Sequence, residues 1–368
     1  MIRLFLILSS VFGLVLYRYP AVSYTAPDHI EVHCTSFESE TQYQTLIQES
    51  GKKSIFWSRG QKSELNQDFL YFVPPMGQGY FEYQKIGKEI AYYAKPDELF
   101  WKRKSASYPV TDLTGSWILL LSGDLTSVRL MDRNGNSASI APLQGILLVD
   151  YSFATLLKDK LLEHWAAVMF STGPLYLIRF EPGFQLYKLS LPKAKDFFAK
   201  SITISGNKIA VHLQQQDVDY IRTYSFNQEE ATLKQIDSVK LPFVIPYRIS
   251  MNFAAAHQLL LSSGDYVGQI IDDKLTWMSV NHNSETHIST PTELSVDFKG
   301  DTLVTESVSL AGGSNFGILF DSKFLPVAKI FRPKNQDKII AYRLLPNSDG
   351  ITIEDKDGYC RIRPSLSR

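Results

Sequence analysis

The chain has 368 residues, of which 44% are apolar and 21% charged, and its 38 Lys and Arg residues are balanced by 38 Asp and Glu residues. This composition is typical of a globular protein with a sizeable core and argues against an intrinsically disordered chain. Because the formal net charge is zero, no overall field attracts the chain to nucleic acid or to an anionic membrane, and we expect no nucleic-acid partner.

The N-terminus has the features of an export signal. Residues 4–17 form an apolar run after Arg3, and the small residues Ala21 and Ser23 follow it. A basic start, an apolar stretch of this length and small residues at a cleavable distance are typical of a signal peptide. We predict that residues 1–23 are removed on export and that the mature chain is periplasmic or secreted. The alternative is an uncleaved anchor, in which case only this segment contacts a membrane.

Short apolar runs of β type recur along the rest of the chain. They are marked by Leu70, Ile118, Ala166, Ile209, Leu259, Leu303 and Ile351. The successive spacings are 48, 48, 43, 50, 44 and 48 residues. A strand-rich repeat of about 40 to 50 residues is the period of a propeller blade. The sequence therefore predicts an all-β fold, a seven-bladed β-propeller, with six or eight blades if one spacing merges or hides a unit.

Turn-forming residues separate these runs and complete the strand pattern. Residues 119–124 read Leu-Leu-Leu-Ser-Gly-Asp, and residues 260–265 repeat the pattern as Leu-Leu-Ser-Ser-Gly-Asp. Gly, Asn and Asp suit tight turns because they tolerate positive φ. Only residues 154–163 and 193–199 have helical character, and we expect them to be short insertions between strands.

The two ends of the chain predict how the ring closes. The last unit, at about residues 339–362, supplies only three strands, whereas residues 29–37 form an extra strand before the first unit, which begins near residue 53. We predict that this N-terminal strand completes the last blade within a single domain of residues 29–364. The only two cysteines, Cys34 and Cys360, would then lie in neighbouring strands. They are a candidate disulfide, and the alternative is a pair of buried thiols.

This repeat resembles the β-propeller superfamily over about residues 30–364, and its period and strand order are similar to those of WD-repeat and YVTN-type seven-bladed proteins. The signatures of both families are missing. None of the five tryptophans is followed by Asp, and no Tyr-Val-Thr-Asn run is repeated. The resemblance implies a fold and no functional residue.

The histidines and cysteines do not predict a metal site. His29, His33 and Cys34 lie close together, and His282 and His287 are five residues apart, but neither group has the spacing of a zinc site. We therefore expect no metal and no cofactor.

Catalytic motifs are equally weak. No Gly-x-Ser-x-Gly motif is present, and the glycine-rich residues 312–317 lie between two strands, which favours a hairpin loop over a phosphate-binding loop. Propeller glycosidases use two carboxylates about 5 to 10 Å apart. Asp150, Asp219 and Asp265 are candidates, and the sequence does not say which of them approach one another.

Two aromatic loops suggest a contact surface. Residues 74–81 and 96–103 combine turn formers, large side chains and charge. Exposed Tyr, Trp and Arg are common anchors of protein interfaces, so Tyr80, Phe100, Trp101 and Arg103 are candidate binding residues. The alternative is that Phe100 and Trp101 pack between blades. We predict a non-catalytic scaffold that binds a protein partner, a ligand or a cell-envelope component, and the alternative is a propeller hydrolase of glycosidase or lactonase type.

Overall fold

The fold is described from a computed structural model of the chain. The described residues are 28–31, 45–49, 52–57, 61–74, 79–105, 107, 109–139, 141–154, 157–158, 161–162, 164–171, 174–191, 197–242, 248–255, 257–263, 266–279, 292–296, 302–306, 316–331, 341–344, 351–355 and 358–362. All regular elements among these residues are β-strands, as the sequence predicted. None of the described residues belongs to a helix that is long and apolar enough to cross a membrane.

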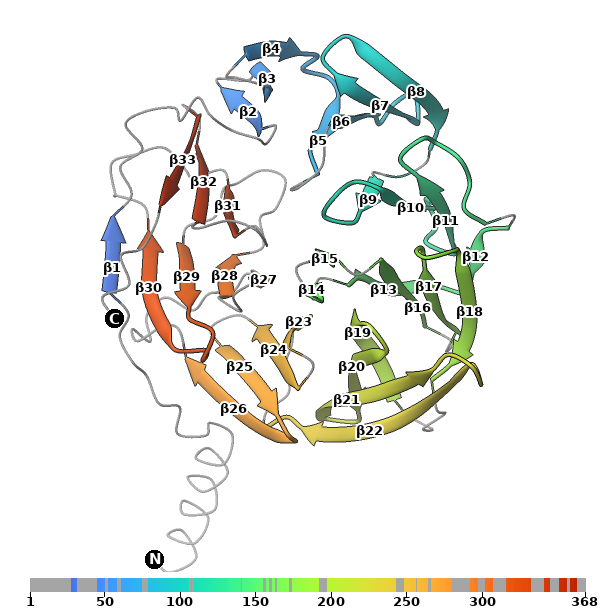
Figure 1. Cartoon of the computed structure of the whole chain (residues 1–368), viewed down its shortest axis with the longest axis vertical. Helices are drawn as coiled ribbons and strands as arrows, with labels where there is room; N and C mark the ends of the chain where they lie inside the picture. The colour runs from blue at the N-terminus through green and yellow to red at the C-terminus, as the bar shows by residue number, and fades with distance from the viewer. Residues whose placement is uncertain are drawn as a thin grey trace, which may run out of the picture.

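The described strands form eight sheets of three or more strands: one has five strands, five have four and two have three. Figure 1 shows these sheets arranged around a common axis, with the first strand of each sheet nearest the axis except in the five-stranded sheet, where β27 is innermost and β1 is outermost. Consecutive strands pair as antiparallel hairpins within each sheet. Successive first strands also contact one another, from β13 to β19, β23, β27 and β31.

The first half of the ring contains four sheets and a short hairpin. The first two sheets contain β2 (Thr45–Glu49), β3 (Lys52–Trp57) and β4 (Gln61–Leu65), then β5 (Leu70–Phe72), β6 (Tyr80–Gln84), β7 (Glu89–Lys95) and β8 (Glu98–Lys104). The next two contain β9 (Pro109–Thr111), β10 (Trp117–Leu121), β11 (Ser127–Asp132) and β12 (Leu143–Gln144), then β13 (Leu148–Phe153), β16 (Trp165–Phe170), β17 (Pro174–Arg179) and β18 (Gln185–Ser190). The hairpin contains β14 (Leu157–Lys158) and β15 (Leu161–Leu162).

The second half contains the other four sheets. Two of them contain β19 (Phe197–Ser205), β20 (Lys208–Gln215), β21 (Val218–Asn227) and β22 (Thr232–Lys240), then β23 (Ser250–Ala255), β24 (Gln258–Ser263), β25 (Tyr266–Ile271) and β26 (Lys274–Ser279). The last two contain β27 (Thr292–Val296), β28 (Thr302–Glu306), β29 (Phe316–Phe320), β30 (Pro326–Phe331) and β1 (Asp28–Glu31), then β31 (Ala341–Leu344), β32 (Ile351–Asp355) and β33 (Gly358–Ile362).

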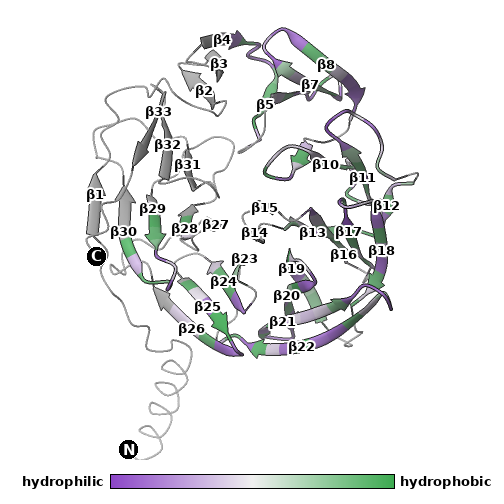
Figure 2. Cartoon of the chain, in the orientation of Figure 1, coloured by the Kyte–Doolittle hydropathy of each residue, from purple (hydrophilic) through white to green (hydrophobic). Residues whose placement is uncertain are grey.

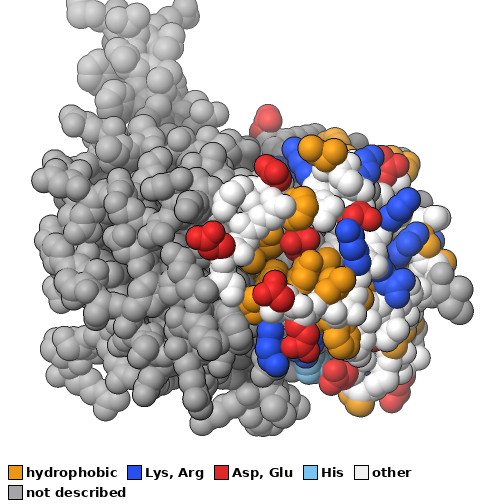
Figure 3. Space-filling model, turned by 90° about the horizontal axis from the view of Figure 1, so that it is seen from above, with side chains coloured by type: hydrophobic (Ala, Val, Ile, Leu, Met, Phe, Trp, Pro, Cys, Tyr) orange, Lys and Arg blue, Asp and Glu red, His pale blue; other side chains and the backbone are white. Residues whose placement is uncertain are grey.

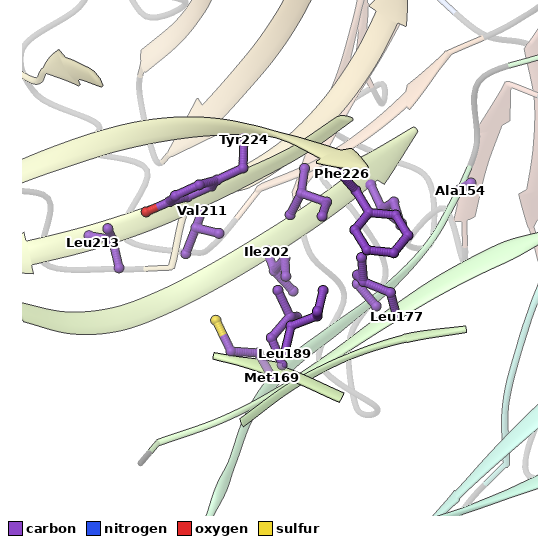
Figure 4. Close-up of a cluster of buried hydrophobic side chains, with 13 residues drawn as sticks. Ala154, Met169, Leu177, Leu189, Ile202, Val211, Leu213, Tyr224 and Phe226 are labelled. Carbon is purple, nitrogen blue, oxygen red and sulfur yellow. The ribbon is translucent and has the colours of Figure 1, made fainter. Parts of the chain in front are cut away.

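The hydrophobic core lies between the sheets and joins them in sequence order. One cluster combines Met169 and Leu177 from β16 and β17 with Val211 and Tyr224 from β20 and β21, and it is drawn in Figure 4. Similar clusters join β5–β8 to β9–β12, the latter to the β13 sheet, β19–β22 to β23–β26, and β23–β26 to β27–β30. Each internal sheet therefore buries both faces against its neighbours, which is the packing of a propeller and not of a two-sheet sandwich.

This packing explains why the middle strands are apolar throughout. In β16, five of six residues are buried, because both faces of the strand are covered. The outermost strands have one edge free, and hydrophilic residues predominate along β8, β18 and β22 (Figure 2). The contrast between these strands produced the recurring apolar runs in the sequence.

The predicted count of seven units is not confirmed, because the described strands form eight sheets. The marker Leu70 begins a first strand, β5, whereas the marker Ile118 lies in a second strand, β10. The interval before Leu70 therefore holds a separate sheet, β2–β4. Its strands β2 and β4 are mostly polar and lack an apolar run like those at the other markers.

Two further predictions differ from the structure. The N-terminal strand β1 pairs in parallel with the outer edge of β30, with Ile30 opposite Ile330, and its described residues 28–31 do not pair with β33. The closure of the last sheet by this strand is therefore not confirmed. The helical character expected within residues 154–163 and 193–199 is also wrong for the residues described there. Residues 157–158 and 161–162 form the β14–β15 hairpin, and residues 197–199 begin the strand β19.

Several predictions fall outside the described residues. The predicted signal peptide, Cys34, His33, His282, His287, Asp265 and the glycine-rich residues 312–315 are among them. Cys360 lies in β33 opposite Ile353, but only its backbone is described. The Cys34–Cys360 disulfide and the export of the chain remain predictions.

Candidate functional site

Buried charges are concentrated around β19, whose ladder with β20 contains a bulge. The register shifts between Ala199 and Ser201, so Lys200 is the extra residue on β19. Bulges re-aim side chains, and they often occur close to functional sites. Here the bulged strand connects two polar groups, one on the side of β13 and one within its own sheet.

The first group is centred on Asp150 of β13. Its Oδ2 accepts a hydrogen bond of 2.8 Å from the backbone N–H of Ile202, and its Oδ1 contacts the guanidinium of Arg248. Burial raises the pKa of Asp150 to about 6, and the charge of Arg248 and the hydrogen bond from Ile202 offset only part of this effect. The Arg248 side chain is 57% exposed, so the pair presents its cationic partner to solvent and keeps its carboxylate covered.

The second group joins His212 of β20, Asp219 of β21 and Lys200. The Oδ1 of Asp219 lies 3.0 Å from His212 Nε2 and 3.0 Å from Lys200 Nζ. Burial lowers the pKa of His212, and Asp219 opposes that effect. The Nδ1 atom of His212 is buried and has no hydrogen-bond partner. A second ring proton would therefore lack an acceptor, and the neutral Nε2–H form suits the site.

Neither of the carboxylates in these polar groups is accessible to a substrate. Asp150 and Asp219 lie in neighbouring sheets and are linked through β19, but each carboxylate is covered and neutralised by its own cation. They could not act on a substrate without movement of the surrounding strands. Within the described part of the chain, no cluster of three or more His, Cys, Asp or Glu side chains could hold a metal ion.

The sequence alone could have indicated the second group. His212 interrupts the apolar run of β20, and a polar residue in a strand buried on both faces needs a partner. Asp219 lies seven residues later, across the β20–β21 hairpin and diagonal to His212 on the same face of the sheet. Lys200 and Arg248 carry no such local signal.

The four predicted binding residues lie in the sheet β5–β8 and separate into different environments. Tyr80 is only 3% exposed, and its ring stacks on Tyr93 with centroids 5.0 Å apart. It therefore offers no ring to a partner. Trp101 donates a 2.6 Å hydrogen bond from Nε1 to the Arg133 carbonyl of the adjacent sheet. This contact agrees with the alternative stated above, in which Trp101 packs between sheets.

Phe100 and Arg103 are on the surface of β8. Phe100 is 56% exposed and its neighbour Leu99 is 51% exposed, while Arg103 is also exposed. A register shift makes Phe100 an extra residue opposite Tyr92, so it bulges from the strand. Six of the seven residues of β8 are exposed, and they include Lys102 and Lys104.

β8 is the outermost strand of its sheet, so one of its backbone edges has no neighbouring strand among the described residues. Viewed from the part of the ring that carries β4–β8, hydrophobic side chains gather near the middle of the described surface and Lys and Arg side chains gather at one end (Figure 3). We refer to Leu99, Phe100 and Arg103 as the β8 surface. Leu99 is the member of this surface that the sequence did not indicate.

No protein-family model matches the chain, and no curated protein matches it. Among solved structures, the chain is similar to a variant of Kluyveromyces lactis Hsv2 in which a Gly-Ser linker replaces loop 6CD, with a TM-score of 0.51, 10% sequence identity, and coverage of 79% of this chain and 94% of that chain.

Two other structures are similar at lower scores. Apo AztD from Citrobacter koseri has a TM-score of 0.47 and 12% identity, covering 82% of this chain and 86% of that chain. The dihydro-heme d1 dehydrogenase NirN in complex with DHE has a TM-score of 0.45 and 13% identity, covering 89% of this chain and 69% of that chain.

The sheet packing and the likeness to Hsv2 define the class: the chain has a β-propeller fold. The identity of 10% supports the fold alone and carries no ligand or activity to this chain. The finer resemblance to WD-repeat or YVTN-type proteins is not confirmed.

Proposed function

We propose that this chain is an exported, non-catalytic propeller scaffold that binds a protein partner through the β8 surface. The observation that carries the proposal is the exposure of Leu99 and Phe100 on an outer strand that also carries Arg103. Aromatic residues and arginine are enriched at protein interfaces, which Phe100 and Arg103 match, and Leu99 adds apolar area beside them. Trp101, the residue after Phe100, ties β8 to the adjacent sheet through its hydrogen bond to Arg133.

The outer edges of these sheets are also able to accept an additional strand. The fold provides an internal example, because β1 pairs in parallel along β30. A partner segment that covers β8 would satisfy free backbone groups in the same way, while Leu99 and Phe100 supply apolar contact. The exposed Arg103 favours a partner segment that carries a carboxylate.

A hydrolase with a site at the centre of the ring has less support. Asp150 and Asp219 are the carboxylates that the sequence offered for it, and both are covered and engaged with cations. Turnover of nitrophenyl glycosides or lactones by the purified chain would favour the hydrolase over the scaffold. Export, and a partner in the periplasm or the cell envelope, rest on the N-terminal sequence.

The test is site-specific photo-crosslinking in cells that express the chain. Benzoylphenylalanine replaces Phe100 in one variant and Ile236 in a matched control. Ile236 is 51% exposed on β22, which is also an outermost strand. We expect position 100 to give a discrete crosslinked protein, identified by mass spectrometry, and position 236 to give none.

A second substitution adds specificity to this test. Arg103→Glu in the position-100 variant should reduce the crosslinked product severalfold, because it reverses one charge of the β8 surface. Equal products at positions 100 and 236, or no product at either, would contradict the proposal.

A further inference from the structure

A pocket of about 500 Å³ lies where the sheet β5–β8 meets the sheet β9–β12. Its lining combines residues from the β6–β7 turn, the end of β8, and strands β10 and β11. Ser105, just after β8, donates its backbone N–H to the carbonyl of Lys88 at 2.7 Å, so one wall of the pocket is held by a backbone contact. A concave site of this size at a junction of two sheets suits a small ligand.

Three cationic side chains line this pocket: Lys88, Lys104 and Arg129. They come from separate strands or turns, and no acidic side chain is among the lining residues. Within the described part of the chain, none of the three forms an ion pair. Lys88 also has a φ of 50°, in the left-handed region that residues other than glycine rarely adopt. The fold therefore brings three uncompensated positive charges to one concavity.

The carboxylates that are close in sequence are engaged elsewhere. Glu89, next to Lys88, lies 2.6 Å from Lys102 Nζ. Asp124 accepts a 2.6 Å hydrogen bond from the Ser122 hydroxyl and another from the Thr126 N–H, and these bonds lower its pKa. Neither carboxylate neutralises the positive charge of the pocket in this arrangement. An anion from outside the chain could therefore neutralise it.

The rest of the lining indicates what else the anion carries. Leu120, Leu121 and Pro142 supply an apolar wall, and Ser127 supplies a hydroxyl without a hydrogen-bond partner within the described part of the chain. Three cations match a group with about two negative charges better than a single carboxylate, and a phosphate monoester has that charge near neutral pH. The apolar wall suits the carbon part of the ester.

We propose that this pocket binds an organic phosphate monoester, with its oxyanion among Lys88, Lys104 and Arg129 and its carbon part against Leu120 and Pro142. The site is separate from the β8 surface, and binding of a small anion does not require the protein partner proposed above.

The test is isothermal titration of the full-length protein with phenyl phosphate at low salt, with phenyl sulfate and phenol as comparison ligands. We expect saturable binding of phenyl phosphate below about 5 mM, weaker binding of the singly charged phenyl sulfate, and none of phenol. Arg129→Gln and Lys104→Gln should each weaken phenyl phosphate binding about threefold to tenfold. Raising NaCl to about 0.5 M should weaken it further, because exposed charges are screened.

Matched controls separate this site from the rest of the surface. Lys234→Gln removes one exposed cation from β22 and should leave phenyl phosphate binding unchanged. Phe100→Ser should also leave it unchanged, although it removes the proposed protein contact. Cosedimentation with phosphatidylcholine vesicles, with and without phosphatidic acid, shows whether the ester can be membrane-borne: specific pelleting supports a lipid headgroup, and its absence alongside phenyl phosphate binding supports a soluble ester.

Two results would overturn the proposal. One is no saturable binding of phenyl phosphate by folded protein. The other is equal loss of binding in Arg129→Gln, Lys104→Gln and Lys234→Gln, with circular dichroism confirming that all three variants are folded.

Discussion

The ionisation of Asp150 gives a stability signal that can be calculated from the structure. Its pKa is raised to about 6 in the folded chain, because burial disfavours the carboxylate more than Arg248 stabilises it. In the unfolded chain the pKa of an aspartate is about 3.9. The folded state therefore binds the proton more tightly, and the resulting stability, about 3 kcal/mol, is fully present below about pH 4 and lost as pH rises through about 6.

Asp150→Asn removes this titration without changing the size of the side chain. Between pH 4.5 and pH 8 the wild type should lose about 2 kcal/mol relative to the variant, since part of the effect lies below pH 4.5. For a cooperative unit of this length, that corresponds to about 3 °C in Tm. Thermal melting of both proteins across this pH range measures the difference.

A second variant tests the cause of the shift. Arg248→Met removes the charge that lowers the pKa of Asp150, so the pH at which the stability is lost should rise. A difference between wild type and Asp150→Asn that stays constant with pH would refute the reasoning. A wild type that gains stability relative to Asp150→Asn as pH rises would mean that the ion pair with Arg248 outweighs burial.

Other variants test the remaining contacts. Burial lowers the pKa of His212, so this histidine is protonated at a higher pH in the unfolded chain than in the folded chain. The wild type should therefore lose more thermal stability than His212→Asn as pH falls below about 6.5. Trp101→Phe removes the hydrogen bond to the adjacent sheet and should cost about 1 to 2 kcal/mol in denaturant melts. Gly145→Ala places a Cβ against the buried Phe170 ring and should lower stability by about 1 to 3 kcal/mol in the same assay. If Cys34 and Cys360 form a disulfide, reduction should cost about 2 to 4 kcal/mol, and two titratable thiols in the unreduced, denatured chain would contradict the bond.

The fold class could be predicted from the sequence because strands covered on both faces are apolar throughout. Ile118 and Ile209 both mark such strands, and each is fully buried in the second strand of its own sheet. The number of sheets could not be predicted in the same way. The strands β2 and β4 combine polar and apolar residues and leave no comparable signal.

The position of β1 could not be predicted from a count of strands. Every sheet has an outer edge that can accept a strand, and the sequence does not indicate that β30 is the edge that is used. The candidate site shows the same limit. His212 and Asp219 are related by one hairpin, whereas Asp150, Ile202 and Arg248 come from distant segments and meet only through tertiary packing.

Amide hydrogen exchange of the purified chain, with and without the protein crosslinked at position 100, tests the scaffold account most directly. If a partner covers the β8 surface, the amides of residues 98–104 should exchange more slowly in the complex, while those of β22 should be unchanged. Unchanged exchange in β8, with protection elsewhere on the ring, would contradict the account.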